Sequence, residues 1–235
     1  MEIVKLKEKT SSQTTKIGVV DYGRGNLRSV GKALEAAGAR VEMLTDPSRF
    51  DAVDAVVVPG VGSFGDCAGS LKNSGMWDAL QEWLRTDRPY LGICLGYQLL
   101  FETSEESPEA RGLGYLPGRV VRFPVTDLKI PHMGWNTLSA ATGPLYQGEV
   151  GTGAFYFVHS YYPVPAEAGL TSAICEYGVP FAASISWGAV HATQFHPEKS
   201  QAGGLALLEN FIKTVSDPES KGSLNKTSHA APAGH

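Results

Sequence analysis

The chain has 235 residues, of which 43% are hydrophobic and 19% charged, and a formal net charge of -4. These values are ordinary for a globular protein of one substantial domain or two small ones, and they give no electrostatic case for binding nucleic acid or an anionic membrane. The N-terminus lacks the apolar segment of a secretory signal, and no apolar run reaches the roughly 20 residues that a membrane span needs. Three cysteines without a C-x-x-C pair suit a reducing compartment. We therefore expect a cytoplasmic protein.

The two ends differ in composition from the rest of the chain. Residues 1–15 and 216–235 are polar, and the second segment is also rich in small residues. Such segments bury too little apolar surface to offset their ordering entropy, so we expect two disordered tails around one domain at residues 16–215.

The first half of the domain alternates between apolar strands and helices. In chain order we expect strands at 16–23, 39–44, 54–60 and 89–94, and helices at 26–39, 66–85 and 95–102. Asn26 is placed to cap the first helix and Gly38 to end it, and the second helix is interrupted near residues 73–75. Strands that are apolar throughout and separated by helices indicate a parallel sheet with helices on both faces.

The second half has another texture, because strand-like segments follow one another with little helix between them. They lie at 118–124, 137–141, 154–163, 171–177, 181–187 and 190–197, before a closing helix at 201–215. The predicted fold class is therefore α/β: a mostly parallel sheet with an added antiparallel or mixed region in the second half.

The segment at residues 89–101 indicates a nucleophile. A buried strand brings Cys94 to the start of a helix, and Gly92 and Gly96 flank it as G-x-C-x-G. This is typical of a nucleophile elbow, a tight strand-to-helix turn that projects a reactive side chain. The helix N-terminus favours a thiolate, and amides just after Cys94, beginning with Leu95, can donate to an oxyanion. Judged alone, Cys94 fits a small buried hydrophobe equally well.

A nucleophilic thiol needs a base, and His196 is the candidate. It ends the segment at 190–197, and Glu198 follows two residues later. On a strand these two side chains share a face, so the carboxylate can orient the imidazole. A strand-end histidine beside a solvated glutamate remains an alternative. A metal site of His191, His196 and Glu198 is disfavoured, because the spacing matches no zinc motif.

Together, G-I-C-L-G-Y-Q at 92–98 and H-P-E at 196–198 resemble the class I glutamine amidotransferases. Further segments resemble one branch of that family, the glutaminase subunits of imidazole glycerol phosphate synthase in histidine biosynthesis. These segments lie at 21–30, 59–67, 131–136, 156–162 and 194–200. The string P-H-M-G-W-N at 131–136 is the most telling of them. The resemblance covers residues 16–215 and departs at Tyr97, where the family usually has Met; we expect this to be a tolerated difference beside the pocket.

The resemblance implies a flavodoxin-like α/β domain that uses no cofactor or metal. It also implies a triad in which Cys94 attacks L-glutamine and forms a thioester, His196 relays protons and Glu198 holds His196. The oxyanion hole is implied to consist of backbone amides at Gly60, Val61, Gly62 and Leu95. The glutamine-binding residues are implied to be Gln98, Glu106, Ser160 and Tyr161. The acidic surroundings of Glu106 also fit a solvated loop.

The resemblance further implies a protein partner, the (β/α)8-barrel cyclase subunit. Such a barrel needs ~250 residues of its own, so we expect a separate chain. The cyclase would combine the ammonia with a phosphoribulosyl formimino carboxamide ribotide, giving imidazole glycerol phosphate and an aminoimidazole carboxamide ribotide. The expected docking residues lie in an extended loop and just after the triad: His132, Met133, Trp135, Asn136 and Lys199. Trp135 also fits a core aromatic. Docking is expected to complete the oxyanion hole.

Three rival interpretations remain. The acceptor could belong to the guanine, anthranilate or pyridoxal phosphate pathway, which the strings at 21–30 and 131–136 disfavour. A cysteine peptidase of similar fold is disfavoured by Glu198. A non-catalytic subunit is disfavoured because Cys94, His196 and Glu198 are all present.

Overall fold

The computed structural model describes residues 14–124 and 126–216. The predicted tails at 1–15 and 216–235 lie almost entirely outside these residues. At their inner edges, the hydroxyl oxygens of Thr15 and Ser216 are 2.8 Å apart. Among the helices of the described part, none combines the length and apolar character that crossing a membrane requires.

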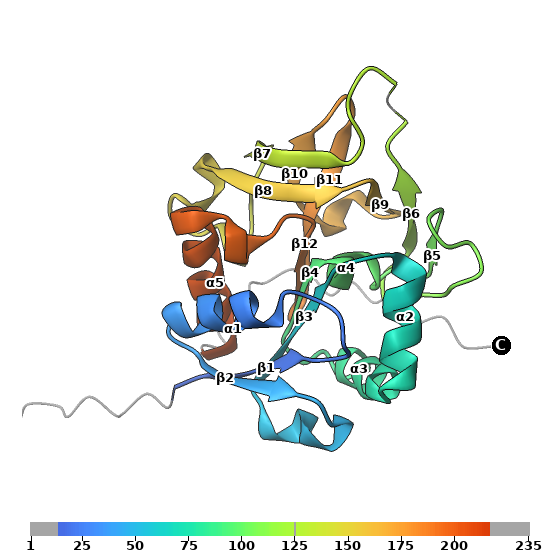
Figure 1. Ribbon diagram of the computed structural model, residues 1–235. Helices are drawn as coiled ribbons and strands as arrows, with labels where there is room; N and C mark the ends of the chain where they lie inside the picture. The colour runs from blue at the N-terminus through green and yellow to red at the C-terminus, as the bar shows by residue number, and fades with distance from the viewer. Residues whose placement is uncertain (1–13, 125, 217–235) are drawn as a thin grey trace, which may run out of the picture.

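A nine-stranded sheet forms the centre of the molecule, in the order β2-β1-β3-β4-β12-β11-β10-β7-β8 (Figure 1). Its strands are β1 (Lys16–Val20), β2 (Arg40–Leu44), β3 (Ala55–Gly60), β4 (Tyr90–Cys94), β7 (His132–Ser139), β8 (Ala154–His159), β10 (Thr171–Glu176), β11 (Pro180–Trp187) and β12 (Val190–Thr193). The strands from β2 to β12 in this order pair in parallel, and the remaining pairs are antiparallel. A second sheet contains β5 (Thr103–Ser104), β6 (Gly118–Arg122) and β9 (Tyr161–Pro165). The predicted mostly parallel α/β sheet with a mixed second half is confirmed.

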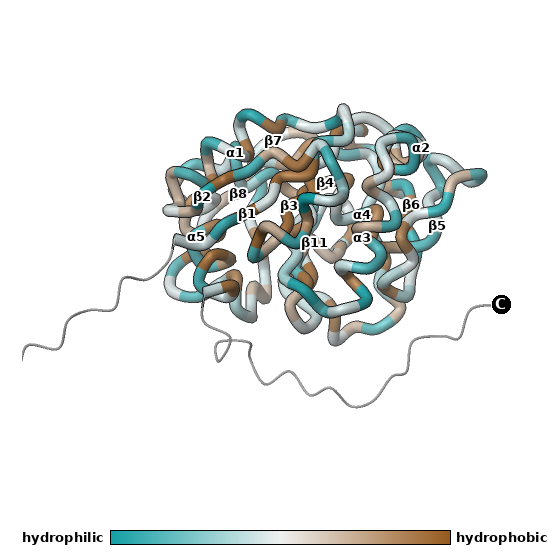
Figure 2. Tube along the Cα trace, turned by 90° about the horizontal axis from the view of Figure 1, so that it is seen from below, coloured by the Kyte–Doolittle hydropathy of each residue, from teal (hydrophilic) through white to brown (hydrophobic). Residues whose placement is uncertain are grey.

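Helices cover both faces of the parallel strands, as Figure 1 shows. The helices are α1 (Leu27–Ala36), α2 (Phe64–Asn73), α3 (Met76–Arg85), α4 (Leu95–Gln98) and α5 (Gln201–Ser216). Alternate residues of β3 divide between two apolar clusters: Val57 packs in the cluster with α1 and α5, whereas Val56 and Val58 pack in the cluster with α2 and α3. Hydrophobic residues accordingly concentrate along the central strands β1, β3 and β4 in Figure 2.

The first helix and the helix interruption follow local signals, with one exception. Gly38 has φ +98° just beyond α1, and Gly75 has φ +74° between α2 and α3, as the predicted helix end and break require. The predicted cap of Asn26 is wrong: its side chain makes no capping hydrogen bond. Its backbone has φ -87° and ψ 58° instead of the extended conformation that directs a cap side chain at the helix amides.

The helix predicted at 95–102 ends early, at Gln98. The carbonyls of Leu99 and Leu100 accept from the amides of Leu113 and Leu116, at 2.7 and 3.0 Å. A later segment of the chain therefore takes the backbone partners that a continuing helix would use.

Two predictions in the second half also need correction. The segment at 154–163 is not one strand, because it breaks at Ser160 and sends β8 and β9 into different sheets. The extended loop predicted around P-H-M-G-W-N is the strand β7, which pairs with β8 from His132↔His159 to Thr137↔Ala154. Cross-strand pairing of a whole segment outweighs the turn signals that its proline and glycine give.

Candidate active site

Cys94 lies at the tight junction between β4 and α4. Its backbone has φ +56° and ψ -105°, a strained conformation for a residue with a side chain. A Cβ on Gly92 would lie 2.6 Å from the carbonyl oxygen of Gly96, and a Cβ on Gly96 would collide with the carbonyl oxygen of Val58. The turn therefore closes because both flanking residues lack side chains.

The sheet register brings the other functional segments to Cys94. Gly60 at the end of β3 is paired with Cys94, and Thr193 at the end of β12 is paired with Ile93. Because parallel strands end at the same edge of a sheet, the segment after Thr193 lies beside Cys94. The amide of His196 in this segment donates to the carbonyl of Tyr156 at 2.9 Å.

His196 and Glu198 form a buried pair. The Nδ1 atom of His196 donates to Oε1 of Glu198 at 2.9 Å, and their side chains are 3% and 1% exposed. The strand geometry expected for the pair is wrong, because β12 ends at Thr193 and Glu198 lies in a 3-10 turn, Pro197–Lys199. The turn, rather than a shared strand face, brings carboxylate and imidazole together.

Two opposing effects act on the pKa of His196. Burial lowers its pKa, but the interactions with Cys94 and Glu198 outweigh burial and raise the pKa to about 10. With Nδ1 held by Glu198, the buried Nε2 atom has no hydrogen-bond partner within the described residues. Cys94 is close enough to interact with the imidazole electrostatically. The ring is thus fixed at one nitrogen and free to exchange a proton at the other.

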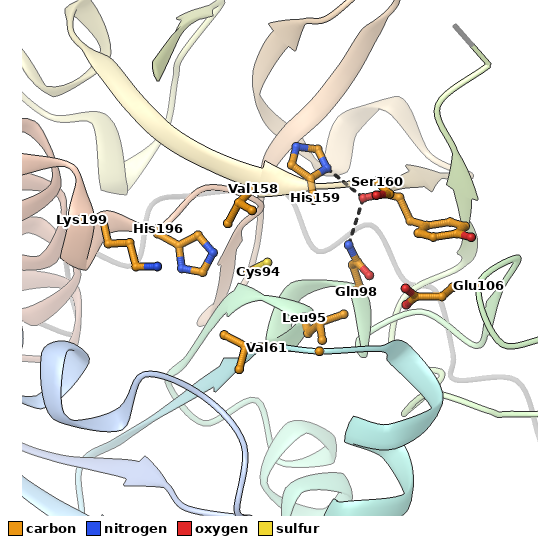
Figure 3. Close-up of a pocket in the computed structure, with 12 residues that line it drawn as sticks. Val61, Cys94, Leu95, Gln98, Glu106, Val158, His159, Ser160, His196 and Lys199 are labelled. Carbon is orange, nitrogen blue, oxygen red and sulfur yellow. Dashed lines mark hydrogen bonds between the residues drawn. The ribbon is translucent and has the colours of Figure 1, made fainter. Parts of the chain in front are cut away.

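A pocket of about 240 Å³ opens over Cys94 (Figure 3). It is lined by Val61, Gly62, Cys94, Leu95, Gln98, Glu106, Val158, His159, Ser160, Tyr161, His196 and Lys199. Most residues predicted for the oxyanion hole and for glutamine binding therefore surround one space. Gly60 is not among the lining residues, and a Cβ added to it would be 2.6 Å from the Cβ of Leu95. Tyr97 is fully buried in the core and is not among the residues that line the pocket.

The polar side chains of the wall are anchored to the backbone. Glu106 accepts from the amide of Phe64 at 2.7 Å, so its carboxylate is held at the start of α2. Gln98 and His159 both donate to the carbonyl of Tyr161, at 3.0 and 2.9 Å, as the dashed lines in Figure 3 mark. The buried Oε1 of Gln98 has no partner in the described part of the chain, which leaves it as an acceptor for a ligand.

Sequence reasoning missed three residues at this site. Val158 and His159 line the pocket, and the Nε2 atom of Gln194 donates to Sγ of Cys94 at 3.6 Å. Gln194 reaches Cys94 because β12 pairs with β4 and places Thr193 beside Ile93, one residue before the contact. The sequence shows two apolar strands but not their register.

The predicted docking residues separate into exposed and buried groups. Met133 and Trp135 are 62% and 50% exposed, two positions apart on β7, so Trp135 is not a core aromatic. His132 is only 2% exposed and stacks on Tyr177 with ring centroids 4.1 Å apart. Burial lowers the pKa of His132 to about 4.

The two remaining docking candidates are bound to different neighbours. Asn136 donates to the carbonyl of Glu176 at 2.9 Å. Lys199 is exposed at the pocket rim, with its ammonium 5.6 Å from the ring centroid of Tyr156. Met133 pairs with the pocket residue Val158, so the exposed docking candidates Met133, Trp135 and Lys199 form an exposed face near the pocket.

A strained cysteine turn beside a buried histidine–carboxylate pair on an α/β sheet is an arrangement that hydrolases with a cysteine nucleophile use. The family model "Glutamine amidotransferase class-I" matches residues 18–215. The chain belongs to this family of glutamine amidotransferase enzymes.

Its relatives narrow the family to one branch. The chain is 49% identical to the imidazole glycerol phosphate synthase subunit HisH of Desulfitobacterium hafniense, over 86% of this chain and 95% of that protein. It is 46% identical to the same subunit of Moorella thermoacetica, over 93% of this chain and 99% of that protein. The resemblance to the glutaminase subunits of this synthase is therefore confirmed.

Solved structures bear out the fold. "Structure of PurLQS from Thermotoga maritima" aligns with a TM-score of 0.68 at 17% identity, covering 86% of this chain and 99% of that one. A putative GMP synthase subunit from Thermoplasma acidophilum aligns with a TM-score of 0.65 at 19% identity, covering 87% and 95%.

Proposed function

We propose that this chain hydrolyses L-glutamine to glutamate and ammonia and passes the ammonia to a separate cyclase subunit. The observation that carries this proposal is the convergence of Cys94 and the His196–Glu198 pair on one pocket of about 240 Å³. The names of the relatives support the same reaction, and we place it in the cytoplasm.

The triad acts in two steps. The Cys94 thiolate attacks the carboxamide carbon, and the charged His196 donates its Nε2 proton to the leaving nitrogen, so that ammonia departs and a glutamyl thioester remains on Cys94. Water then adds to the thioester, and His196 takes a proton from it as glutamate leaves. Glu198 holds Nδ1–H of His196 at 2.9 Å throughout, which fixes the tautomer and stabilises the imidazolium.

The remaining pocket residues suit glutamine. We assign the oxyanion of each tetrahedral intermediate to the backbone amides of Val61, Gly62 and Leu95 around the nucleophile. The unpaired Oε1 of Gln98 and the carboxylate of Glu106 suit the amino group of the substrate. Ser160 and Tyr161 in the pocket wall bind the substrate carboxylate in this assignment.

The exposed face near the pocket is the docking surface in this proposal. Met133 and Trp135 form an apolar patch beside the charged Lys199, which is the mixture of anchors common at protein interfaces. The partner is a (β/α)8-barrel cyclase that makes imidazole glycerol phosphate and aminoimidazole carboxamide ribotide. Its docking, with its ligand bound, completes the oxyanion hole.

Replacing Cys94 tests the chemistry. Cys94→Ala, mixed with the cyclase, is expected to lose glutamine-dependent synthase activity while ammonia-dependent activity persists. Near-normal glutamine turnover by Cys94→Ala would overturn the assignment. The coupling is tested separately, by the glutaminase rate with and without the cyclase and its substrate, and equal rates would contradict it.

A further inference from the structure

A chain of side-chain amides runs from the pocket wall to the nucleophile. It starts at the carbonyl of Tyr161, which can only accept, so Gln98 must present its NH2 group at the observed 3.0 Å. The same Nε2 atom is 3.2 Å from Oε1 of Gln194. Both hydrogens of Gln98 are therefore in use, and its orientation follows from the network.

The direction of Gln194 is fixed in turn. Because its Oε1 accepts from Gln98, its Nε2 faces Cys94, 3.6 Å from Sγ. A flipped Gln194 amide would set two NH2 groups against each other and an oxygen against the sulfur. The carbonyl of Tyr161 thus determines, through two amides, that an N–H donor points at the nucleophile.

The surrounding backbone holds this donor rigidly. Gln194 is fully buried, and its own amide donates to the carbonyl of Ala183 on β11 at 2.8 Å. Thr193, the last residue of β12, pairs with Ile93 on β4. Gln194 and Cys94 are therefore the residues that follow this pair on the two chain segments. Gln194 contacts the sulfur without lining the pocket.

We propose that Gln194 is a further catalytic residue: its side-chain amide holds the Cys94 sulfur and stabilises its negative charge before attack. This inference rests on the proposed function, since it assumes that Cys94 is the nucleophile. A hydrogen bond to a charged group in a buried site corresponds to a factor of about 10 to 100 in rate when it is lost. Gln194 does not line the pocket, and without it Gln98 keeps its hydrogen bond to the carbonyl of Tyr161, so removal of Gln194 affects turnover much more than substrate binding.

The test replaces Gln194 by a side chain of similar length without donor or acceptor. In the full chain assembled with its cyclase, Gln194→Met is expected to lower kcat for glutamine about 10- to 100-fold and to leave KM within about twofold. The pH profile for alkylation of Cys94 by iodoacetamide moves to higher pH, which a merely structural role would not cause.

Thr193→Val is the matched control. It removes the neighbouring buried hydrogen bond from Oγ1 of Thr193 to the carbonyl of Phe195, 3.0 Å long, in the same segment. It is expected to keep kcat and the alkylation profile. Unchanged kcat and alkylation in folded Gln194→Met, or the same losses in both variants, would overturn the proposal.

A second measurement tests the proposal even if Gln194→Met does not fold. The unmutated chain is labelled with 15N in its glutamine side chains and followed by NMR. One side-chain amide that is protected from exchange is expected to change its chemical shift over the same pH range as the alkylation profile of Cys94. No such amide would overturn the inference. Failure of this inference can be distinguished from failure of the proposed function. If only the inference fails, Cys94→Ala is inactive while Gln194→Met turns glutamine over normally.

Discussion

The parallel and antiparallel parts of the central sheet contribute different things to the pocket. Strands β3, β4 and β12 end side by side and bring Gly60, Cys94 and Gln194 together through backbone register. Antiparallel β8 supplies the wall that ends in His159, and its neighbour β7 exposes Trp135. In the proposed function, the chemistry therefore depends on close backbone approach in one part, and partner recognition depends on side chains presented by the other.

The largest effect is expected where the backbones come closest. Gly96→Ala places a Cβ at the start of α4 against the carbonyl oxygen of Val58 on β3, a clash with backbone that no side-chain rotation can relieve. We expect a loss of at least about 3 kcal/mol in the free energy of unfolding, measured with urea. Gly69→Ala is the control, since a Cβ there meets nothing within 4 Å inside α2. Its effect should stay within about 1 kcal/mol and be favourable. Equal losses in both variants would contradict the close-packed turn.

The next largest effect is expected at the His196–Glu198 pair, which the 3-10 turn after β12 brings together. Glu198→Gln keeps the shape but removes the charge that favours the imidazolium of His196, so the pKa of His196 falls. We expect kcat to fall on the order of 100-fold or more, with a smaller change in the free energy of unfolding. Steady-state kinetics across pH measure both the rate and the shifted profile. The exposed Glu102→Gln is the control, and a comparable loss there would remove the special role of Glu198.

The same contrast explains what the sequence could predict. The turn at Cys94 and the apolar parallel strands have local signals, namely glycines at fixed spacing and continuous apolar runs. The contact of Gln194 with Cys94 depends on register, and the early end of α4 depends on a segment more than ten residues away that binds the carbonyl of Leu99. The break at Ser160 has no local signal either, because the residues on both sides favour strands.

The pH dependence of stability tests whether the parallel and antiparallel parts of the sheet unfold as one unit. Burial lowers the pKa of His191 on β12 to about 4 and that of His159 on β8 to about 3. Below pH ~6.5 the unfolded chain binds protons at these residues that the folded chain does not, so stability falls as the pH drops from 6.5 towards 4. Each histidine contributes up to about 1.4 kcal/mol per pH unit to this slope.

His191→Gln and His159→Gln are each expected to reduce that slope by a similar amount, measured by urea unfolding at several pH values between 4 and 6.5. Gln stays neutral in this range and retains a hydrogen-bonding group for Ser186 or for the carbonyl of Tyr161. Two separate unfolding transitions, each sensitive to only one of the variants, would show that the parallel and antiparallel parts are independent units.

The smallest effect on the isolated chain is expected at Trp135. Half of this side chain is exposed, and within residues 14–124 and 126–216 its ring contact is edge-to-face with Tyr156, with the ring centroids 6.1 Å apart. Trp135→Ala should therefore change the free energy of unfolding by less than about 1 kcal/mol, yet weaken cyclase binding by about 2 kcal/mol or more if this face docks the partner. Calorimetric titration with the cyclase measures the second quantity. Met43→Ala at the opposite edge of the sheet, 42% exposed on β2, is the control and should not change the affinity. A Trp135→Ala variant that destabilises the isolated chain by several kcal/mol, or binds the cyclase as tightly as the unmutated chain, would show that β7 supports the fold and not recognition.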